Sequence, residues 1–270
     1  MSVYRYTDLL PDQLAERLAV CPVAIAPWGA LEWHGPHLPF GLDGLVAEGF
    51  SERLAARTGA VLLPATYAPI TALPHPGSLS ISTGHVAGMW ADLFAGLGAA
   101  GFRVVCLVSG HYAQGHELAL VEAAEQSLNA GGPLVLAGTP LALLEDMALL
   151  DHAGRWETSQ LLALRPELVH LEKLPSGALP GAKDVAVLGQ DPRQASAGQG
   201  EEVLARALEA WAGWIERLRA GADPAPLFEL YARRRDAYAG YVRRFYRESW
   251  EQAIEDWWQA VTSHKPYTGG

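Results

Sequence analysis

The sequence is poor in cysteine, poor in basic residues and without any long apolar run. Only two cysteines occur among 270 residues, so no disulfide framework is implied. Thirty acidic residues against twenty basic ones give a formal net charge of −10, which argues against nucleic acid or an anionic membrane surface as a partner. No uncharged apolar stretch reaches the roughly 18 residues of a membrane-spanning helix, and the N-terminus does not resemble a signal peptide. The expectation is a soluble, cytoplasmic protein that acts on a small molecule.

Half of the residues are apolar, which is enough for one sizeable core in a single α/β domain. Apolar, strand-like runs alternate with helical patterns through the first 164 residues. The expected strands are 23–26, 61–64, 103–109 and 133–137, and the expected helices are 43–57, 85–100, 117–129 and 141–150. This alternation predicts a doubly wound, mostly parallel sheet flanked by helices on both faces. In such sheets ligands bind outside the carboxyl ends of the strands.

The second half of the chain follows a different pattern. Residues 166–200 are rich in Pro, Gly, Ala and Gln, which predicts a long surface excursion with one short strand near 185–188. An amphipathic helix is expected at 201–219, and it completes a domain of residues 1–220. Residues 221–270 combine aromatic and arginine side chains with interleaved glutamates, so we expect a helical arm packed on the domain or on a neighbouring subunit, not a nucleic-acid site.

The segment from Glu32 to Asp43 is the richest in chemistry, with two carboxylates and two histidines within twelve positions directly after the first strong strand pattern. Glu32 and His34 are two residues apart, so an extended backbone places both side chains on one face and Trp33 on the other. Asp43 begins a helical pattern. Carboxylate oxygen together with imidazole nitrogen suits a zinc- or manganese-type ion. The segment therefore predicts a metal site on a loop at the carboxyl end of a strand.

Two later clusters carry the same residue types. His111 follows the expected strand 103–109 in a glycine-containing turn, where it could bind a metal or only hydrogen bond at the strand end. Asp151 precedes His152 and could orient its imidazole, the usual arrangement for a general base or a ligand. Glu157 opens a predicted helix, so its carboxylate could be a ligand or simply a first-turn acid favoured by the helix dipole.

In combination and in order, these three clusters resemble the creatininase family, the creatinine amidohydrolases and their relatives. Residues 32–39 with Asp43 are similar to the family's E-x-H-G-x-H-x-P…D motif. Residues 109–112 resemble its G-H-[GY] turn, and residues 151–159 resemble its D-H-A-G-x-x-E-T-S segment. Weaker similarities lie at 76–80 and 190–196, and the resemblance covers about residues 20 to 215.

The resemblance implies a hydrolase with one or two zinc and/or manganese ions per subunit, on a doubly wound α/β fold, in a homo-oligomer such as a hexamer. By position it implies that His152 is the general base or acid. It also implies a set of metal ligands: Glu32, His34, Asp43 as the bridge, and His111. Two ions a few ångströms apart can activate a water and polarise a carbonyl, which are the roles that a hydrolysis needs.

One position departs from creatininase itself. That enzyme has an acidic ligand two residues after the histidine of its G-H-Y turn, and the corresponding residue here is Ala113. The second metal site is then completed by Glu157, by His116, or not at all. We favour Glu157, because it follows His152 by five residues in a segment that must approach the metals if His152 does. His116 is then expected to contact substrate.

The expected activity is metal-dependent hydrolysis of the C–N bond of a small polar amide, cyclic or open. An alternative keeps the same metal site but opens the ring of a keto-inositol at a C–C bond, an activity that also occurs in the family. A catalytically silent metal-binding member is a third interpretation, disfavoured because the whole ligand set is retained. The side chains expected to contact substrate are Trp33, His75, Ser78, Tyr112, Gln114 and His116.

Overall fold

A six-stranded sheet, parallel throughout its described pairings, forms the centre of the protein. The computed structural model describes residues 3–245 with gaps at 71, 74, 112, 145 and 222; the side chains of 114, 115, 117, 118, 147, 182, 183, 235 and 237–245 are outside that description. The strand order is β1-β3-β2-β5-β6, and β4 pairs with β2. The strands are β1 (Tyr4–Arg5), β2 (Val23–Gly29), β3 (Val61–Leu62), β4 (Thr66–Tyr67), β5 (Val104–Ser109) and β6 (Leu134–Gly138). The predicted α/β class with a parallel sheet is confirmed.

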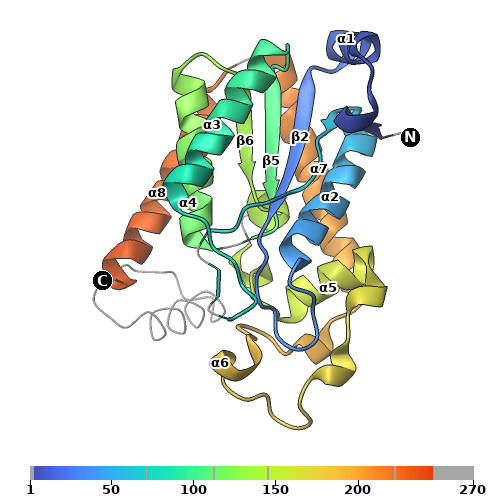
Figure 1. The fold of residues 1–270 in the computed structure, drawn as a ribbon, viewed down its shortest axis with the longest axis vertical. Helices are drawn as coiled ribbons and strands as arrows, with labels where there is room; N and C mark the ends of the chain where they lie inside the picture. Colours follow the sequence, from blue (N-terminus) through green and yellow to red (C-terminus); the bar gives the residue numbers. More distant parts are fainter. Residues whose placement is uncertain are drawn as a thin grey trace.

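Helices cover the sheet. They are α1 (Pro11–Val20), α2 (Leu42–Thr58), α3 (Thr83–Ala99), α4 (Gln114–Asn129), α5 (Arg155–Leu164), α6 (Ala182–Val185), α7 (Ala197–Gly221) and α8 (Ala225–Phe245). Helices α3 and α4 pack on each other, α2 contacts α5 and α7, and the sheet lies between these two groups (Figure 1). Within the described part of the chain, no helix has the length and apolar character needed to cross a membrane.

The central strands β2 and β5 are buried along their whole length. They pair in parallel from Val23 opposite Val104 to Trp28 opposite Ser109. Such continuous apolar runs are typical of strands covered by helices on both faces. Because the two strands are in register, their carboxyl ends reach the same level of the sheet, and the loops that follow them begin side by side.

The predicted helix at 141–150 is wrong. The segment forms two short 3-10 helices, Pro140–Leu144 and Met147–Leu149. Among the side chains of this segment that the structure describes, Pro140, Leu141 and Leu149 are buried. Leucine and alanine favour a helix in this sequence, but here Leu141 and Leu149 make separate contacts with the core and do not form one continuous buried stripe.

The predicted strand near 185–188 is also wrong. Helix α6 ends at Val185, and Ala186 has a φ of 57°, in the left-handed region that interrupts an extended chain. Only Leu188 pairs, in a single antiparallel bridge to His152. The apolar residues of this segment reach the interior through a turn. The short N-terminal elements β1 and α1 had no predicted counterpart.

The predicted helical arm is present as α8, which packs on its own domain through β6. The Tyr231 hydroxyl donates to the carbonyl of Val135 and accepts from the N–H of Ala137, 3.1 Å away. The Arg234 guanidinium donates to the Ala137 carbonyl. The aromatic part of the expected arm beyond Phe245 lies outside the described residues, so the division into 1–220 and 221–270 stays a prediction.

Candidate metal centre

Two glycines allow helix α2 to begin directly against the ends of β2 and β5. A Cβ on Gly29, the last residue of β2, would lie 2.2 Å from the backbone nitrogen of Gly44. A Cβ on Gly110, just after β5, would lie 1.9 Å from the carbonyl oxygen of Asp43. No larger residue fits at either position. The first turn of α2 therefore rests on the carboxyl edge of the sheet, and it places Asp43 where the two strands end.

Five predicted ligands meet at Asp43, and all five are buried. Asp43 presents Oδ1 at 3.1 Å from His34 Nε2 and Oδ2 at 3.0 Å from His111 Nδ1. Glu32 Oε2 lies 3.0 Å from His111 Nδ1, and Glu157 Oε2 lies 3.7 Å from His34 Nε2. The carboxylate of Asp43 thus lies between two histidines, each with a second carboxylate beside it.

Main-chain carbonyls orient both imidazoles. His34 Nδ1 lies 3.0 Å from the carbonyl oxygen of Glu32, and His111 Nε2 lies 3.1 Å from that of Ile70. A nitrogen that faces a carbonyl carries the ring proton, so the opposite nitrogen of each neutral ring presents a lone pair to the cluster. This is the tautomer that a metal ligand requires.

The cluster fits divalent cations. In these tautomers, which metal binding would require, the short contacts between imidazoles and carboxylates share no proton. Among the described residues, Glu32 Oε2, His34 Nε2 and both oxygens of Asp43 are then buried without a hydrogen-bond partner. Buried charged groups are costly unless they are paired or bind a metal. Within the described part of the chain, three sets have their ligand atoms within 4.8 Å of one another: Glu32–Asp43–His111, His34–Asp43–Glu157 and Glu32–His34–His152.

Without a cation, protons compensate the carboxylates. Burial alone would lower the pKa of His34, but Asp43, Glu157 and Glu32 outweigh it and raise the pKa to about 10. Burial would also lower the pKa of His111, yet Glu32 and Asp43 raise it well above its usual value. Burial raises the pKa of the Glu157 carboxyl well above its ordinary range. The cluster therefore holds protons where a metal site would hold positive charge.

His152 lies at the edge of the cluster. Its ring is 4.4 Å from that of His34 between centroids, and its Nε2 lies 3.0 Å from the carbonyl oxygen of Trp33. Burial, and then the charge of His34, lower the pKa of His152 to about 4. A neutral ring that donates Nε2–H to Trp33 retains Nδ1 as a proton acceptor. Its backbone is held by the antiparallel bridge to Leu188.

Asp151 does not orient His152, contrary to the interpretation from sequence. Its carboxylate accepts hydrogen bonds from the backbone N–H groups of Trp156 (2.7 Å) and Glu157 (3.0 Å) and so caps the first turn of α5. Glu157 Oε2 in turn accepts from the N–H of Ala153 at 2.7 Å. Glu157 is thus both a first-turn residue and a member of the cluster.

His116, the alternative to Glu157 as a metal ligand, belongs to none of the three sets found among the described residues. Its fully buried ring stacks on Trp28 with centroids 3.4 Å apart and meets the ring of His111 edge-on at 4.8 Å. Among the described residues, neither of its ring nitrogens has a hydrogen-bond partner. The structure therefore brings Glu157, and not His116, beside His34 and Asp43. A contact of His116 with substrate stays a prediction.

Three of the predicted substrate residues form one group next to the cluster. Ser78 Oγ accepts a hydrogen bond of 3.0 Å from the backbone N–H of Trp33, and the Trp33 ring stacks on His75 at 4.9 Å. Phe40, which was not predicted, also contacts His75, with ring centroids 5.4 Å apart. We call Trp33, Phe40 and His75 the aromatic rim. Tyr112 and the side chain of Gln114 lie outside the described residues.

The loop between β4 and α3 contributes main-chain groups that the sequence did not indicate. The N–H of Leu73 donates to Glu32, and the carbonyl of Ile70 accepts from His111. Both interactions position the side chains of predicted ligands. The loop contributes only backbone atoms to these interactions, so the side chains of Ile70 and Leu73 could not indicate them in the sequence.

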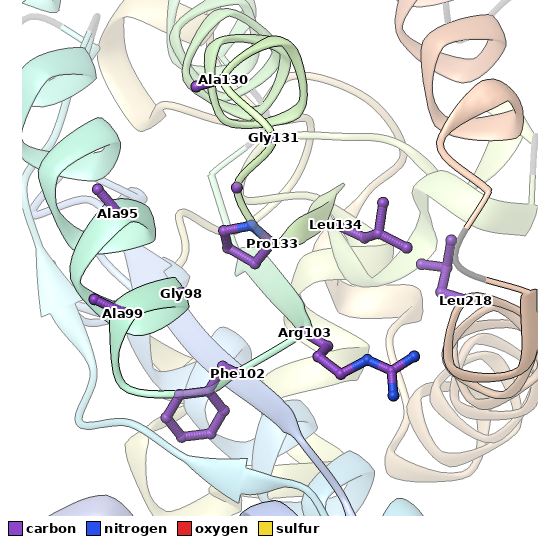
Figure 2. A pocket seen from close by; sticks show the side chains of 11 residues that line it. Ala95, Gly98, Ala99, Phe102, Arg103, Ala130, Gly131, Pro133, Leu134 and Leu218 are labelled. Atoms are coloured by element: carbon purple, nitrogen blue, oxygen red, sulfur yellow. The ribbon is translucent and has the colours of Figure 1, made fainter.

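A separate groove of about 550 Å³ lies at the opposite end of the sheet (Figure 2). It is lined by the residues that precede or begin β5 and β6, including Phe102 and Leu134, and by the end of α3. Arg103 is the one charged residue among its lining residues. None of the lining residues named above belongs to the candidate metal centre.

Fold and cluster together define an α/β protein with a candidate centre for divalent cations at the carboxyl edge of a parallel sheet. The model of the creatininase family, described as creatinine amidohydrolase, matches residues 8–215. The chain belongs to this family and is a hydrolase.

Characterised relatives differ in what they act on. The creatinine amidohydrolase of Pseudomonas putida is 28% identical over 178 residues, 56% of this chain and 68% of that protein. The 3-dehydro-scyllo-inosose hydrolase of Thermotoga maritima is 29% identical over 65% of this chain, and the match spans 62% of that protein. The mycofactocin precursor peptide peptidase of Mycolicibacterium smegmatis is 26% identical over 74% of this chain and 86% of its own length.

Solved structures of creatininase share the fold. One crystal structure has a TM-score of 0.69 and 26% identity, and covers 80% of this chain and 98% of its own. A manganese form has a TM-score of 0.70 and 25% identity, and covers 82% of this chain and 100% of its own. A zinc form is similar as well, with a TM-score of 0.68 at 25% identity, over 82% of this chain and 100% of its own.

Proposed function

We propose that this protein is a metal-dependent amidohydrolase that cleaves the C–N bond of a small polar amide. The observation that carries the proposal is a set of buried ligand atoms on Glu32, His34 and Asp43 that converge where two strands end and have no hydrogen-bond partner among the described residues. Amide cleavage is favoured because the similar proteins include both an amidohydrolase and a peptidase. Zinc or manganese is the expected ion, since creatininase structures with each resemble this chain.

The ligand sets suggest two positions that share Asp43. Glu32, Asp43 and His111 would hold one cation, and His34, Asp43 and Glu157 the other. When bound, such ions supply a Lewis acid for the substrate carbonyl and lower the pKa of a water. The ligand sets contain three carboxylates, whose negative charge two divalent cations would compensate. Glu157 would replace the acidic metal ligand that creatininase has at the position corresponding to Ala113.

His152 would move the proton. Its lowered pKa keeps the ring neutral at physiological pH, so Nδ1 would accept a proton from the attacking water and return it to the leaving nitrogen. The hydrogen bond to the Trp33 carbonyl would hold the ring while this happens. The aromatic rim, which shares Trp33 with that hydrogen bond, would form one wall for the substrate.

A second candidate activity is the hydrolytic opening of a keto-inositol ring at a C–C bond. The Thermotoga maritima relative, a 3-dehydro-scyllo-inosose hydrolase, favours it. The same metal positions would serve, because a ketone carbonyl also needs polarisation by a Lewis acid. A catalytically silent protein is not favoured, since the cluster is complete and a neutral imidazole lies beside it.

One assay separates these activities. Purified protein is stripped with a chelator, reloaded with zinc or manganese, and tested on creatinine and other cyclic amides, short peptides and a keto-inositol. We expect hydrolysis of an amide that disappears with the chelator and returns with metal. Turnover of the keto-inositol alone would establish the second candidate, and turnover that survives complete metal removal would refute both.

The Glu157→Gln variant should weaken one metal selectively. Glutamine keeps an oxygen for the Ala153 N–H but loses the charge beside His34, so the affinity of one ion should fall by about tenfold or more while the other stays bound. Isothermal titration calorimetry of the apoprotein with zinc resolves the binding of the two ions. Glu167→Gln, an exposed carboxylate beyond the end of α5, serves as the matched control. If His116→Gln weakened the metal and Glu157→Gln did not, the ligand assignment would be wrong.

Metal binding should release protons and strengthen as pH rises. In the metal-free protein the neighbouring carboxylates hold the pKa of His34 near 10 and that of His111 well above normal, so both rings are protonated at neutral pH. A ligand nitrogen must lose its proton, so about one proton should leave for each of these histidines. Calorimetry in buffers of different ionisation enthalpy, between about pH 6 and pH 8, measures the number. A pH-independent affinity without proton release would contradict the electrostatics described above.

A further inference from the structure

The first turn of α5 receives its cap from a residue that precedes the helix. Gly154 occupies the N-cap position and has no side chain that could accept a hydrogen bond from the free N–H groups. Both acceptors come from the carboxylate of Asp151: Oδ2 accepts from the N–H of Trp156 at 2.7 Å, and Oδ1 accepts from that of Glu157 at 3.0 Å. Asp151 thus holds the main chain of a proposed metal ligand.

The side chain of Glu157 points back toward the same turn. Its Oε2 accepts a hydrogen bond of 2.7 Å from the N–H of Ala153 and lies 3.7 Å from His34 Nε2. The arrangement resembles a capping box, in which an acidic side chain at the third helical position bonds to the backbone before the helix. The position of the Glu157 carboxylate beside His34 therefore depends on where the backbone of this first turn lies.

Two glycines make room for the Asp151 side chain, which is only 1% exposed. A Cβ on Gly154 would overlap with Asp151 Oδ2, and a Cβ on Gly189 would lie 2.6 Å from Asp151 Cβ. Gly189 also has a φ of 126°, which residues with a Cβ rarely adopt. A methyl group at Gly154 would therefore displace the carboxylate from the N–H groups that it caps.

The turn that leads into α5 has an unfavourable backbone conformation at Ala153. This buried residue has a φ of 51°, in the left-handed region, which persists for a residue with a Cβ only where the surroundings fix it. The preceding residue, His152, is held by the bridge to Leu188, and the N–H of Ala153 is held by Glu157. Loss of the Asp151 cap would release one side of this turn and let the helix start shift.

We propose that Asp151 is a positioning residue that sets the affinity of one metal position by fixing the backbone of Glu157. Asp151 belongs to none of the three candidate ligand sets among the described residues, so it acts through Glu157 and not as a ligand. The affected position is the one formed by His34, Asp43 and Glu157. This inference rests on the proposed function, because it requires Glu157 to bind a metal ion.

The first test removes the cap. Asp151→Ala should lower the zinc affinity of the position that includes Glu157 by about tenfold or more, the usual effect of losing a group that orients a ligand, while the other position stays close to the wild type. Isothermal titration calorimetry of the apoprotein with zinc measures both affinities. Asp223→Ala is the matched control, since Asp223 Oδ1 also accepts from an N–H at a helix start, that of Ala225 at 3.0 Å, but on α8, which carries no proposed ligand. If Asp151→Ala does not fold by circular dichroism, Asp151→Asn, which keeps one acceptor oxygen, takes its place.

The second test separates the position of the carboxylate from its charge. Gly154→Ala keeps the charge of Asp151 but introduces a methyl group where Oδ2 lies, so it should cause a similar and equally selective loss of zinc affinity. The φ of Gly154 is −91°, which alanine adopts without strain. In the Asp151→Ala background this overlap is gone, so adding Gly154→Ala should cause little further loss.

The outcomes distinguish this inference from the ligand assignment. If Glu157→Gln weakens one ion and the Asp151 variant binds both like the wild type, the inference is wrong and the ligand assignment stands. If the Asp151 variant weakens both ions equally and Gly154→Ala weakens neither, the effect is one of charge, and the inference is again wrong. If Glu157→Gln weakens neither ion, the ligand assignment and the inference fail together.

Discussion

Replacing Asp43 by alanine should remove most of the bound metal and nearly all hydrolytic activity. Asp43 offers Oδ1 on the side of His34 and Oδ2 on the side of His111, so its loss affects both proposed metal positions at once. Each position would retain only one imidazole and one carboxylate. We expect a fall in kcat/KM on the order of 10³-fold or more, because the electrostatic contribution of the ions would be lost together with the ions.

Elemental analysis after dialysis measures the metal content of the Asp43→Ala variant. Its fold is checked separately by circular dichroism and by thermal unfolding in chelator, where the variant should unfold somewhat below the wild-type temperature because the metal-free cluster loses the carboxylate that pairs with His34 and His111. The stabilisation that added zinc gives the wild type should be absent. Glu48→Ala, on the same helix but outside the cluster, is the control. Full metal content and activity in Asp43→Ala would show that the centre lies elsewhere.

Replacing His152 by alanine should separate catalysis from metal binding. The neutral ring of His152 is expected to transfer a proton, and losing such a group lowers kcat by roughly 10²–10⁴-fold. The metal content should stay near that of the wild type, because the two ligand sets that share Asp43 do not include His152.

The measurement is kcat on the best substrate from the assay above, together with the zinc content of the same preparation. His152→Asn keeps a polar group near the Trp33 carbonyl and tests whether a hydrogen bond alone is sufficient. A parallel loss of metal and rate would make His152 a ligand, through the third set with Glu32 and His34.

Much of the centre could be predicted because its signals are local. Glu32, His34 and Asp43 lie within one loop and one helix start, and His111 follows a strand whose apolar run is unmistakable. In a parallel sheet the ends of neighbouring strands meet, so the sequence order alone brings these residues to one edge. Glu157 could be proposed only through its distance from His152 along the chain, and the structure does place it beside His34.

What could not be predicted depends on contacts between distant segments. The role of Asp151 was misjudged because its neighbour His152 suggested a side-chain pair, whereas the capped N–H groups belong to the following helix. The apolar residues at 185–188 predicted a strand, but the left-handed backbone conformation of Ala186 interrupts the extended chain. Phe40 joined the aromatic rim only because the loop after β4 folds back over it.

Three imidazoles of this centre are anchored by carbonyl oxygens of the main chain, those of Glu32, Ile70 and Trp33. A substitution changes a side chain but leaves the carbonyl in place, so no single replacement at these anchors deletes the hydrogen bond itself. The side chains around the centre can therefore be exchanged for others while the histidines keep their tautomers. If the aromatic rim contacts substrate as proposed, substitutions of Trp33, His75 and Phe40 would change which substrate is bound while the hydrogen bonds that hold the histidines stay in place.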